Sequence, residues 1–308
     1  MKLIFMGTPD FAVPTLRKLI EAGHEIGFAV TQPDRARNRK QVTFSPVKQA
    51  ALEYGIEVLQ PERLKDSEED RRKIRDYRPD AVIVVAYGQI LKQDVLDIPR
   101  YGCFNVHGSL LPQLRGAAPM QRAILNGLEK TGVTIMRMEQ GLDSGDMIAK
   151  AETEVDHKNF AQLHDELSVM GADLLAATLP KIESGEAVYT KQKDEEATFA
   201  PMLKKQDGKI DFSRDPRQIE RQIRAFDPWP GAFCTYGEKT LKIWRAECPD
   251  ARCELPPGTV TSVHSDSIDI SCGGKLLRVT ELQLPGKRRT AAADFLRGHK
   301  ILPGDVLK

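Results

Sequence analysis

The run Ala81-Val82-Ile83-Val84-Val85-Ala86 most narrows the folds open to this chain. It is apolar at every position and mostly β-branched, so other parts of the protein must cover both of its faces. A strand that is buried on both faces is typical of a parallel sheet with helices on each side. We therefore expect such a sheet around residues 81–86.

Strand-like and helix-like segments alternate around this run. The expected strands are Lys2–Met6, Ile26–Thr31, Glu57–Leu59 and Gly102–Val106. The expected helices are Phe11–Ala22, Pro46–Tyr54 after an N-cap at Ser45, and Glu68–Tyr77. This alternation predicts an α/β fold with a doubly wound sheet and right-handed crossovers. Ligands of such sheets lie beyond the carboxyl ends of the strands, here just after Met6, Ala86 and Val106.

The pattern changes after Gly141. A long helix is expected over Asn159–Ile182, with a break near Pro180, and another over Asp215–Phe226. Short β-like runs follow, separated by Gly and Pro, at Thr240–Trp244, Gly258–Val263, Ser267–Ile270 and Leu276–Gln283. They predict a small β-barrel or sandwich of roughly 100 residues. We place the domain boundary at residue 204, giving domains 1–204 and 205–308, which suits the prior of about 150 residues per domain.

Composition and charge exclude several classes of protein. The apolar fraction of 41% excludes disorder of the whole chain, and no run approaches the ~18 apolar residues of a membrane span. Five cysteines without a C-x-x-C pair predict free thiols and, with no signal peptide at the start, a cytoplasmic protein. Residues 205–308 carry 18 Lys+Arg and 14 Asp+Glu, a net of +4, against 27 and 30 before them. This excess indicates either ordinary surface variation or an anionic partner for the C-terminal domain.

Polar side chains gather where the strand Gly102–Val106 ends. Asn105 and His107 are two positions apart and should share a face of the sheet. An amide can donate to an oxygen that gains negative charge, and an imidazole can stabilise that oxyanion or move a proton. Asp143, in a glycine-containing loop, can orient the imidazole or receive a proton through water. A single His or Asn at a strand end is more often structural, but together the three residues predict an acyl-transfer site.

Two absences refine this prediction. No Ser or Cys stands in a nucleophile elbow, which favours direct transfer over a covalent intermediate. No His, Cys or Asp cluster has the spacing of metal ligands, so we expect no metal.

Several motifs together resemble a known family. Asn105-x-His107-x-Ser109-Leu110-Leu111-Pro112, followed by Arg115-Gly116 and Leu142-Asp143-x-Gly145, resembles the folate-dependent formyltransferases. Further segments narrow the resemblance to the methionyl-tRNA formyltransferases within that superfamily. These segments are Met6–Phe11, Thr31–Arg35, Ser45–Lys48, Val85–Gly88, Arg115–Pro119, Thr131–Met136 and Asp227–Gly231.

The resemblance implies a fold and a reaction. The fold would be a Rossmann-like formyltransferase domain followed by a smaller oligonucleotide-binding-fold-like β-barrel. The enzyme would transfer the formyl group of 10-formyltetrahydrofolate, a cosubstrate, to the α-amino group of initiator methionyl-tRNA for translation initiation. We expect a monomer. The alternative is a formyltransferase that acts on a small-molecule amine such as an amino sugar nucleotide.

The resemblance also assigns residues. The catalytic set would be Asn105, His107 and Asp143. Tetrahydrofolate would be bound by Ser109, Leu110, Leu111 and Pro112, and by Tyr87, Gly88, Gln89 and Ile90. The tRNA would be bound by a basic loop and a C-terminal basic run, at Arg35, Arg37, Arg39, Lys40, Lys287, Arg288 and Arg289.

The basic loop departs from the family pattern. It reads Arg35–Phe44 without the usual Gly-Arg-Gly-type core. Alignment by gapping places the key arginine at Arg39 and leaves Arg37 as the alternative. A solvated surface loop is the other interpretation, but four basic residues in six positions beyond a strand's carboxyl end favour phosphate contact.

Overall fold

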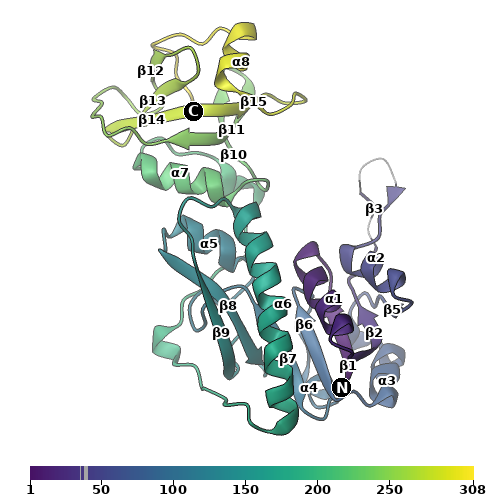
Figure 1. Ribbon diagram of the computed structural model, residues 1–308. Helices are drawn as coiled ribbons and strands as arrows, with labels where there is room; N and C mark the ends of the chain where they lie inside the picture. The colour runs from purple at the N-terminus through teal and green to yellow at the C-terminus, as the bar shows by residue number, and fades with distance from the viewer. Residues whose placement is uncertain (35, 38–40) are drawn as a thin grey trace. The chain divides into compact units, whose positions relative to one another are not determined.

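The structure is a computed structural model that describes residues 1–34, 36–37 and 41–308 (Figure 1). The chain divides into two compact units. The N-terminal unit comprises Met1–Pro119, Lys130–Glu154 and His164–Ala200. The C-terminal unit comprises Met120–Glu129, Val155–Leu163 and Pro201–Lys308. The boundary expected at residue 204 stays a prediction. No helix in the described part of the chain has the length and apolar character that a membrane span requires.

A seven-stranded sheet forms the centre of the N-terminal unit (Figure 1). Its strands are β1 Lys2–Gly7, β2 Glu25–Val30, β5 Glu57–Leu59, β6 Ala81–Val85, β7 Gly102–His107, β8 Lys130–Arg137 and β9 Met147–Glu154. Their order is β5-β2-β1-β6-β7-β8-β9. The first five are parallel, whereas β8 and β9 are antiparallel. The predicted α/β fold and its five strands are confirmed; the antiparallel pair was not predicted.

Helices and short turns connect these strands and cover the sheet. The helices are α1 Val13–Glu21, α2 Pro46–Glu53, α3 Glu68–Tyr77, α4 Gln93–Leu96 and α6 Phe160–Ser184. The described residues also form the 3-10 helices η1 Asp10–Ala12, η2 Leu64–Asp66, η3 Asp194–Glu196 and η4 Lys205–Gly208. Every residue of β6 is buried, as its apolar run requires. The predicted N-cap Ser45 accepts a hydrogen bond from the Lys48 amide, at 3.2 Å, and so starts α2.

Helix α6 differs from its prediction and packs closely against β7. It continues through Pro180 to Ser184, so the break expected near Pro180 is wrong. The apolar face of α6 stays buried on both sides of the proline, at Leu179 and Ile182, and this packing outweighs one lost backbone hydrogen bond. Gly171 allows α6 to approach β7, because a Cβ atom there would lie 2.6 Å from Val106 Cγ1.

The C-terminal unit is an antiparallel sheet with three helices. Its elements are α5 Pro119–Leu125, most of which belongs to this unit, α7 Pro216–Ala225, β10 Ala232–Tyr236, β11 Lys239–Glu247, β12 Val260–Val263, β13 Ile268–Cys272, β14 Lys275–Gln283, β15 Thr290–Ala291 and α8 Ala292–Gly298. The strand order is β10-β11-β14-β13-β12, with β15 beside β14. Apolar side chains from the strands, α7 and α8 form one core.

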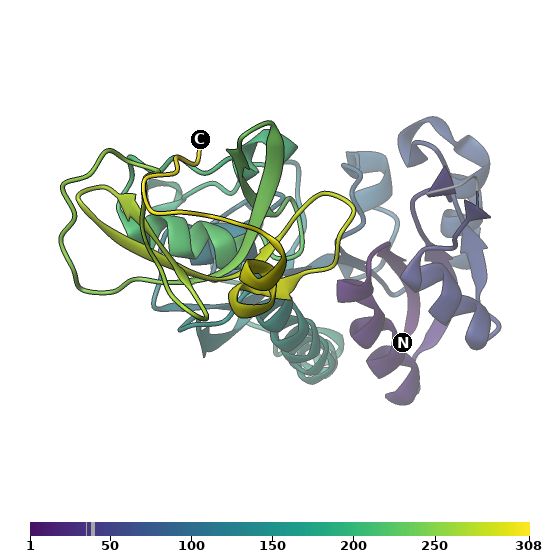
Figure 2. The same cartoon turned by 90° about the horizontal axis from the view of Figure 1, so that it is seen from above.

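The end of the chain closes this sheet into a barrel. Leu307 donates its amide hydrogen to the Gly258 carbonyl, at 2.9 Å, beside β12. Lys308 donates its own to the Thr235 carbonyl of β10, also at 2.9 Å. The last residues therefore lie between the two outer strands, and Figure 2 shows this yellow segment beside them. The predicted smaller β domain is confirmed.

A buried carboxylate stabilises the C-terminal unit. Asp269, on β13, is 3% exposed and takes two hydrogen bonds of 2.8 Å from the Arg278 guanidinium on β14. His264 lies 3.0 Å from the same carboxylate. Burial alone would raise the pKa of Asp269, but the hydrogen bonds and charges of Arg278 and His264 outweigh it and lower that pKa.

We predict that Asp269→Asn lowers the free energy of unfolding of this unit by about 2 kcal/mol at pH 7. Because the folded-state pKa of Asp269 is below that of the unfolded chain, the stabilisation is complete above pH ~4. It is lost as the pH falls through the folded-state pKa, so the variant and the wild type should converge in acid. Trp229 and Trp244, the two tryptophans, both lie in this unit, so urea unfolding followed by their fluorescence measures the effect.

The exposed Asp266→Asn, three residues away, is the control and should change stability by less than about 0.5 kcal/mol. An equal loss at pH 7 and pH 3 for Asp269→Asn would contradict the electrostatic explanation.

Candidate active site

The carboxyl ends of three neighbouring parallel strands define one edge of the N-terminal sheet. Gly7 of β1 pairs with Val85 of β6, and Val84 of β6 pairs with Asn105 of β7. The loops that follow these strands therefore start side by side, at the edge where the sequence places the ligand-binding residues.

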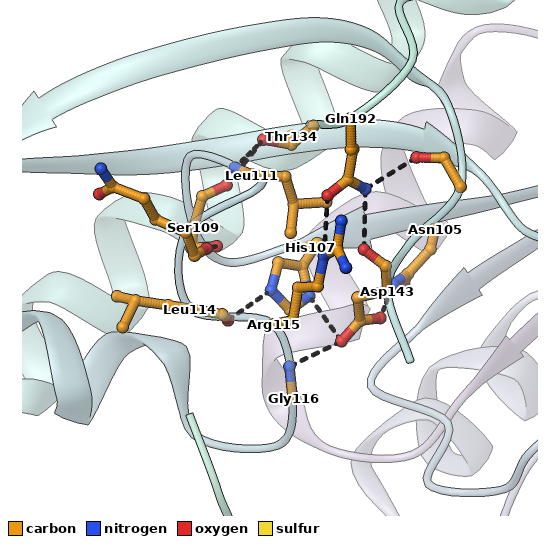
Figure 3. A network of polar contacts seen from close by, with 12 residues as sticks. Asn105, His107, Ser109, Leu111, Leu114, Arg115, Gly116, Thr134, Asp143 and Gln192 are labelled. Atoms are coloured by element: carbon orange, nitrogen blue, oxygen red, sulfur yellow. Dashed lines mark hydrogen bonds and ion pairs between the residues drawn. The ribbon is translucent and has the colours of Figure 1, made fainter. Parts of the chain in front are cut away.

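Asn105, His107 and Asp143 converge beyond the end of β7 (Figure 3). The Asn105 amide nitrogen lies 3.4 Å from Asp143 Oδ1 and donates to it. His107 Nδ1 lies 3.6 Å from Asp143 Oδ2. His107 is 5% exposed, and the Asp143 side chain is 17% exposed. The structure thus brings together three residues that the sequence separates by up to 38 positions.

Both ring nitrogens of His107 face acceptors. Nε2 lies 3.0 Å from the carbonyl oxygen of Leu114, and Nδ1 faces the Asp143 carboxylate. A carbonyl oxygen can only accept, so Nε2 carries a hydrogen in this arrangement. Nδ1 is then the nitrogen at which a proton can pass between the ring and the Asp143 side of the site. The second hydrogen of the Asn105 amide makes no hydrogen bond to the other residues of this cluster.

The backbone of Asp143 has a conformation that non-glycine residues rarely adopt, with φ of +49°. The Gly116 amide holds its carboxylate by donating to Oδ2 at 2.8 Å. Gly116 itself has φ of +119°, and a Cβ atom there would lie 2.8 Å from the Ala200 carbonyl oxygen. Only glycine therefore fits at the position whose amide contacts the carboxylate.

A second layer of polar contacts surrounds Asp143 (Figure 3). Gln192 donates from Nε2 to the carbonyl oxygens of Asp143 and Gly145, each at 2.8 Å. Gln192 Oε1 accepts from Arg115 Nε at 3.0 Å. Arg115 also donates from Nη2 to Asp194, at 2.9 Å. Arg115 and Gln192 are both buried.

The loop after His107 is fixed mainly from strands β8 and β9. Thr134 Oγ1 donates to the Ser109 carbonyl, at 2.7 Å, and accepts from the Leu111 amide, at 3.1 Å. Lys150, the partner of Thr134 across the β8–β9 ladder, donates from Nζ to the Leu111 carbonyl. Burial lowers the pKa of Lys150. Ser109 and Leu111 are fully buried, whereas Leu110 and Pro112 are half-buried.

The loop after β6 offers few polar side chains to a ligand. The ring of Tyr87 is 1% exposed and packs in the core under the sheet edge, and this burial raises its pKa. Gln89 donates to the carbonyls of Pro61 and Glu62 and accepts from the Leu64 amide. Gly88 and Ile90 are exposed, Ile90 at 89%. A ligand at this loop would meet its backbone and Ile90 rather than the Tyr87 or Gln89 side chain.

The residues expected to bind tRNA are only partly described. Arg35, Arg39 and Lys40 lie outside the described residues, and Arg37 is described only as backbone, in the pair of β3 Ala36–Arg37 with β4 Gln41–Val42.

The C-terminal basic run is described in full. Lys287, Arg288 and Arg289 are all exposed, and Arg289 also forms a two-bond ion pair with Asp227. The Arg289 guanidinium also lies 3.9 Å from the centre of the Trp244 ring. Arg289 therefore has a packing role in the C-terminal unit.

Among the residues described, no three His, Cys, Asp or Glu side chains gather as a metal site would need. The expectation that the reaction uses no metal stays a prediction.

Sequence reasoning missed the groups that hold the site together. Gln192 lies outside every helix and strand that the sequence predicts, and Thr134 and Lys150 lie on strands that the sequence analysis does not predict. Arg115-Gly116 was noted as a motif, which is the one signal that could have led to its contacts.

Comparison with known proteins places this site in a family. The sequence profile described as formyl transferase matches residues 1–177, and the profile of the formyl transferase C-terminal domain matches residues 202–300. The chain therefore belongs to the formyltransferase family.

Its relatives over the full length have a narrower name. The methionyl-tRNA formyltransferase of Caldanaerobacter subterraneus is 45% identical, with all of both chains covered. That of Bacillus subtilis is 47% identical, over 99% of this chain and 97% of the relative. The solved structure of WlaRD, a sugar 3N-formyl transferase, is 19% identical with a TM-score of 0.67, over 94% of this chain and 99% of that one, and shares the fold.

Proposed function

We propose that the protein transfers the formyl group of 10-formyltetrahydrofolate to the α-amino group of initiator methionyl-tRNA. The observation that carries this proposal is the convergence of Asn105, His107 and Asp143 at the carboxyl end of β7, in a chain whose full-length relatives are methionyl-tRNA formyltransferases. The cluster holds an amide donor and a proton acceptor, and direct acyl transfer needs both.

The reaction is a direct transfer to an amine. The lone pair of the amine attacks the formyl carbon, and the carbonyl electrons move to oxygen to give a tetrahedral oxyanion. The free N–H of Asn105 donates to this oxygen, and His107 assists once its Nε2 exchanges the Leu114 carbonyl for the oxyanion. The amine loses a proton toward Asp143 and His107. The oxyanion then collapses, the bond to N10 of tetrahydrofolate breaks, and N10 takes up a proton.

The folate side of the proposal rests on the two loops at the sheet edge. Ser109–Pro112 and Tyr87–Ile90 follow adjacent strands, so they can contact the same planar ring from two sides. The fixed backbone of the first loop and the exposed Gly88 and Ile90 of the second offer hydrogen bonds and apolar contact. WlaRD, which shares the fold, has been solved with 5-N-formyl-THF present.

The proposed binding of tRNA rests on two groups of basic residues. These are Arg35, Arg37, Arg39 and Lys40 in the loop after β2, and Lys287, Arg288 and Arg289 in the C-terminal unit. Lys287 and Arg288 are exposed and suit phosphate contact, whereas Arg289 would first have to leave Asp227. We further propose that the protein is a cytoplasmic monomer.

The function predicts that the protein formylates Met-tRNA. With labelled 10-formyltetrahydrofolate, label should appear in initiator Met-tRNA but not in uncharged tRNA or free methionine, because the acceptor is a positioned amine. An amino sugar nucleotide serves as the competing acceptor. Faster transfer to the sugar than to Met-tRNA would overturn the tRNA assignment and leave a small-molecule formyltransferase.

Asn105→Ala should lower kcat by ~10²–10³-fold, the usual cost of losing an oxyanion donor. The KM for the folate should change little, because this amide acts on the transition state. Asn105→Asp keeps the size but replaces the donor with an acceptor, so it should be equally slow. A kcat above about a third of the wild-type value in Asn105→Ala would remove this residue from the mechanism.

His107 and Asp143 should act as one unit, because His107 Nδ1 and Asp143 Oδ2 lie 3.6 Å apart and share one proton pathway. The double variant His107→Ala/Asp143→Ala should then be scarcely slower than the slower single variant. Steady-state kinetics of the four proteins give the coupling. Free-energy losses that simply add would mean that the two side chains act independently.

A further inference from the structure

Gln192 contacts the backbone of the proposed catalytic loop without belonging to the proposed catalytic set. The two hydrogens of its Nε2 go to the carbonyl oxygens of Asp143 and Gly145, each at 2.8 Å. Its Oε1 accepts from Arg115 Nε at 3.0 Å. Gln192 is 6% exposed, so no solvent molecule can readily replace these bonds.

The Gln192 amide can have only one orientation here. The carbonyl oxygens of Asp143 and Gly145 only accept, and a guanidinium only donates. Turning the amide over would place its oxygen against two carbonyls and its NH₂ group against Arg115. Arg115 therefore fixes which end of Gln192 faces the catalytic loop (Figure 3).

These contacts close a ring around Asp143. The residue after Arg115, Gly116, donates its amide to Asp143 Oδ2 at 2.8 Å. The path runs from the Asp143 carboxylate to Gly116, along the chain to Arg115, across to Gln192, and back to the Asp143 carbonyl. The Gly116 amide thus holds the carboxylate of Asp143. The neighbouring Arg115, through Gln192, holds the backbone carbonyl of the same residue.

Asp143 needs such support because of its backbone. Its φ of +49° is disfavoured for a residue with a side chain, and such strain persists only where the surroundings over-determine it. The adjacent Leu142 is 58% exposed, so apolar packing of Leu142 does not anchor the loop. Gln192 holds the Asp143 backbone, and the Gly116 amide, together with the Asn105 side chain, holds the carboxylate in its direction toward His107.

The two supporting residues are themselves well fixed. Thr190, two positions before Gln192, exchanges two backbone hydrogen bonds with Met147, at 2.8 and 2.9 Å. The Arg115 backbone donates to the Thr198 carbonyl, at 2.9 Å, and accepts from the Ala200 amide, at 2.7 Å. The segment that carries Gln192 is therefore attached to β9 at one end and to the Arg115 loop at the other.

We infer that Gln192, oriented by Arg115, is a positioning residue for formyl transfer: it holds the Asp143 loop so that the carboxylate faces His107. This inference rests on the proposed function and names a residue that acts through another. Because Gln192 is buried behind the loop, its loss should misalign the chemical step and leave substrate binding nearly unchanged.

Gln192→Glu tests the inference most sharply. The glutamate keeps the length and the acceptor for Arg115, but sets a carboxylate against the Asp143 and Gly145 carbonyls. We expect kcat to fall by about 10²-fold, the cost of a small misplacement of a catalytic group, with both KM values within about threefold of wild type. Gln192→Met removes the hydrogen bonds without adding a charge and should lower kcat by about tenfold.

Gln222→Glu is the matched control. Gln222 is also buried and donates from Nε2 to two backbone carbonyls, those of Asp207 and Lys209, but it lies in α7 of the C-terminal unit. Its substitution should lower the melting temperature, because it places a buried carboxylate against two carbonyls, and keep kcat within twofold of wild type. Asp194→Asn, which removes only the negative charge of the exposed partner of Arg115, should also keep kcat.

The outcomes separate the inference from the proposed function. Wild-type protein that fails to formylate Met-tRNA would reject the function itself. Active wild type together with folded Gln192→Met at more than a third of wild-type kcat would overturn the positioning role. A loss confined to KM, or an equal loss of kcat in Gln222→Glu, would overturn it too. If Gln192→Glu does not fold, Gln192→Met and Asp194→Asn still decide the question.

Discussion

Strand β7 is the element on which the proposed active site depends, because it is where the parallel and antiparallel parts of the sheet meet. Its parallel partner β6 aligns Asn105 with Val84, and its antiparallel partner β8 aligns His107 with Thr134. The first pairing sets the edge at which two ligand loops begin. The second brings Thr134, and beyond it Lys150, under the loop that follows His107. One strand thereby fixes both the catalytic side chains and the loop beside them.

The sequence predicts the parallel part of this arrangement well, since its signals are local. The apolar run at residues 81–86 and the Ser45 cap each determine their own structure. Strand β9, Met147–Glu154, was missed because alanine and threonine alternate with its charged residues, and alanine has a low strand propensity, so the half-buried pattern is weak. The break expected near Pro180 is wrong because the tertiary packing of α6 outweighs the tendency of proline to end a helix.

The sequence predicts the candidate catalytic residues, but not the residues that hold them in place. Asn105 and His107 share a strand, so period-two geometry places them together. Asp143 needs contacts between segments that are far apart in the chain. Gln192 lies 49 residues from Asp143, and nothing in the letters around it indicates two carbonyls and an arginine. Backbone carbonyls have no sequence signature, which is why structure alone reveals this layer of the site.

The closure of the C-terminal sheet by residues 304–308 has a consequence for association between molecules. A barrel whose outer strands are both paired offers no row of open amides to another chain. The N-terminal sheet is open and ends in β5 and β9. Strand β5 has only three residues, and β9 carries the charged residues Lys150, Glu152 and Glu154. The short length of β5 at one edge and the charged residues of β9 at the other discourage edge-to-edge polymerisation.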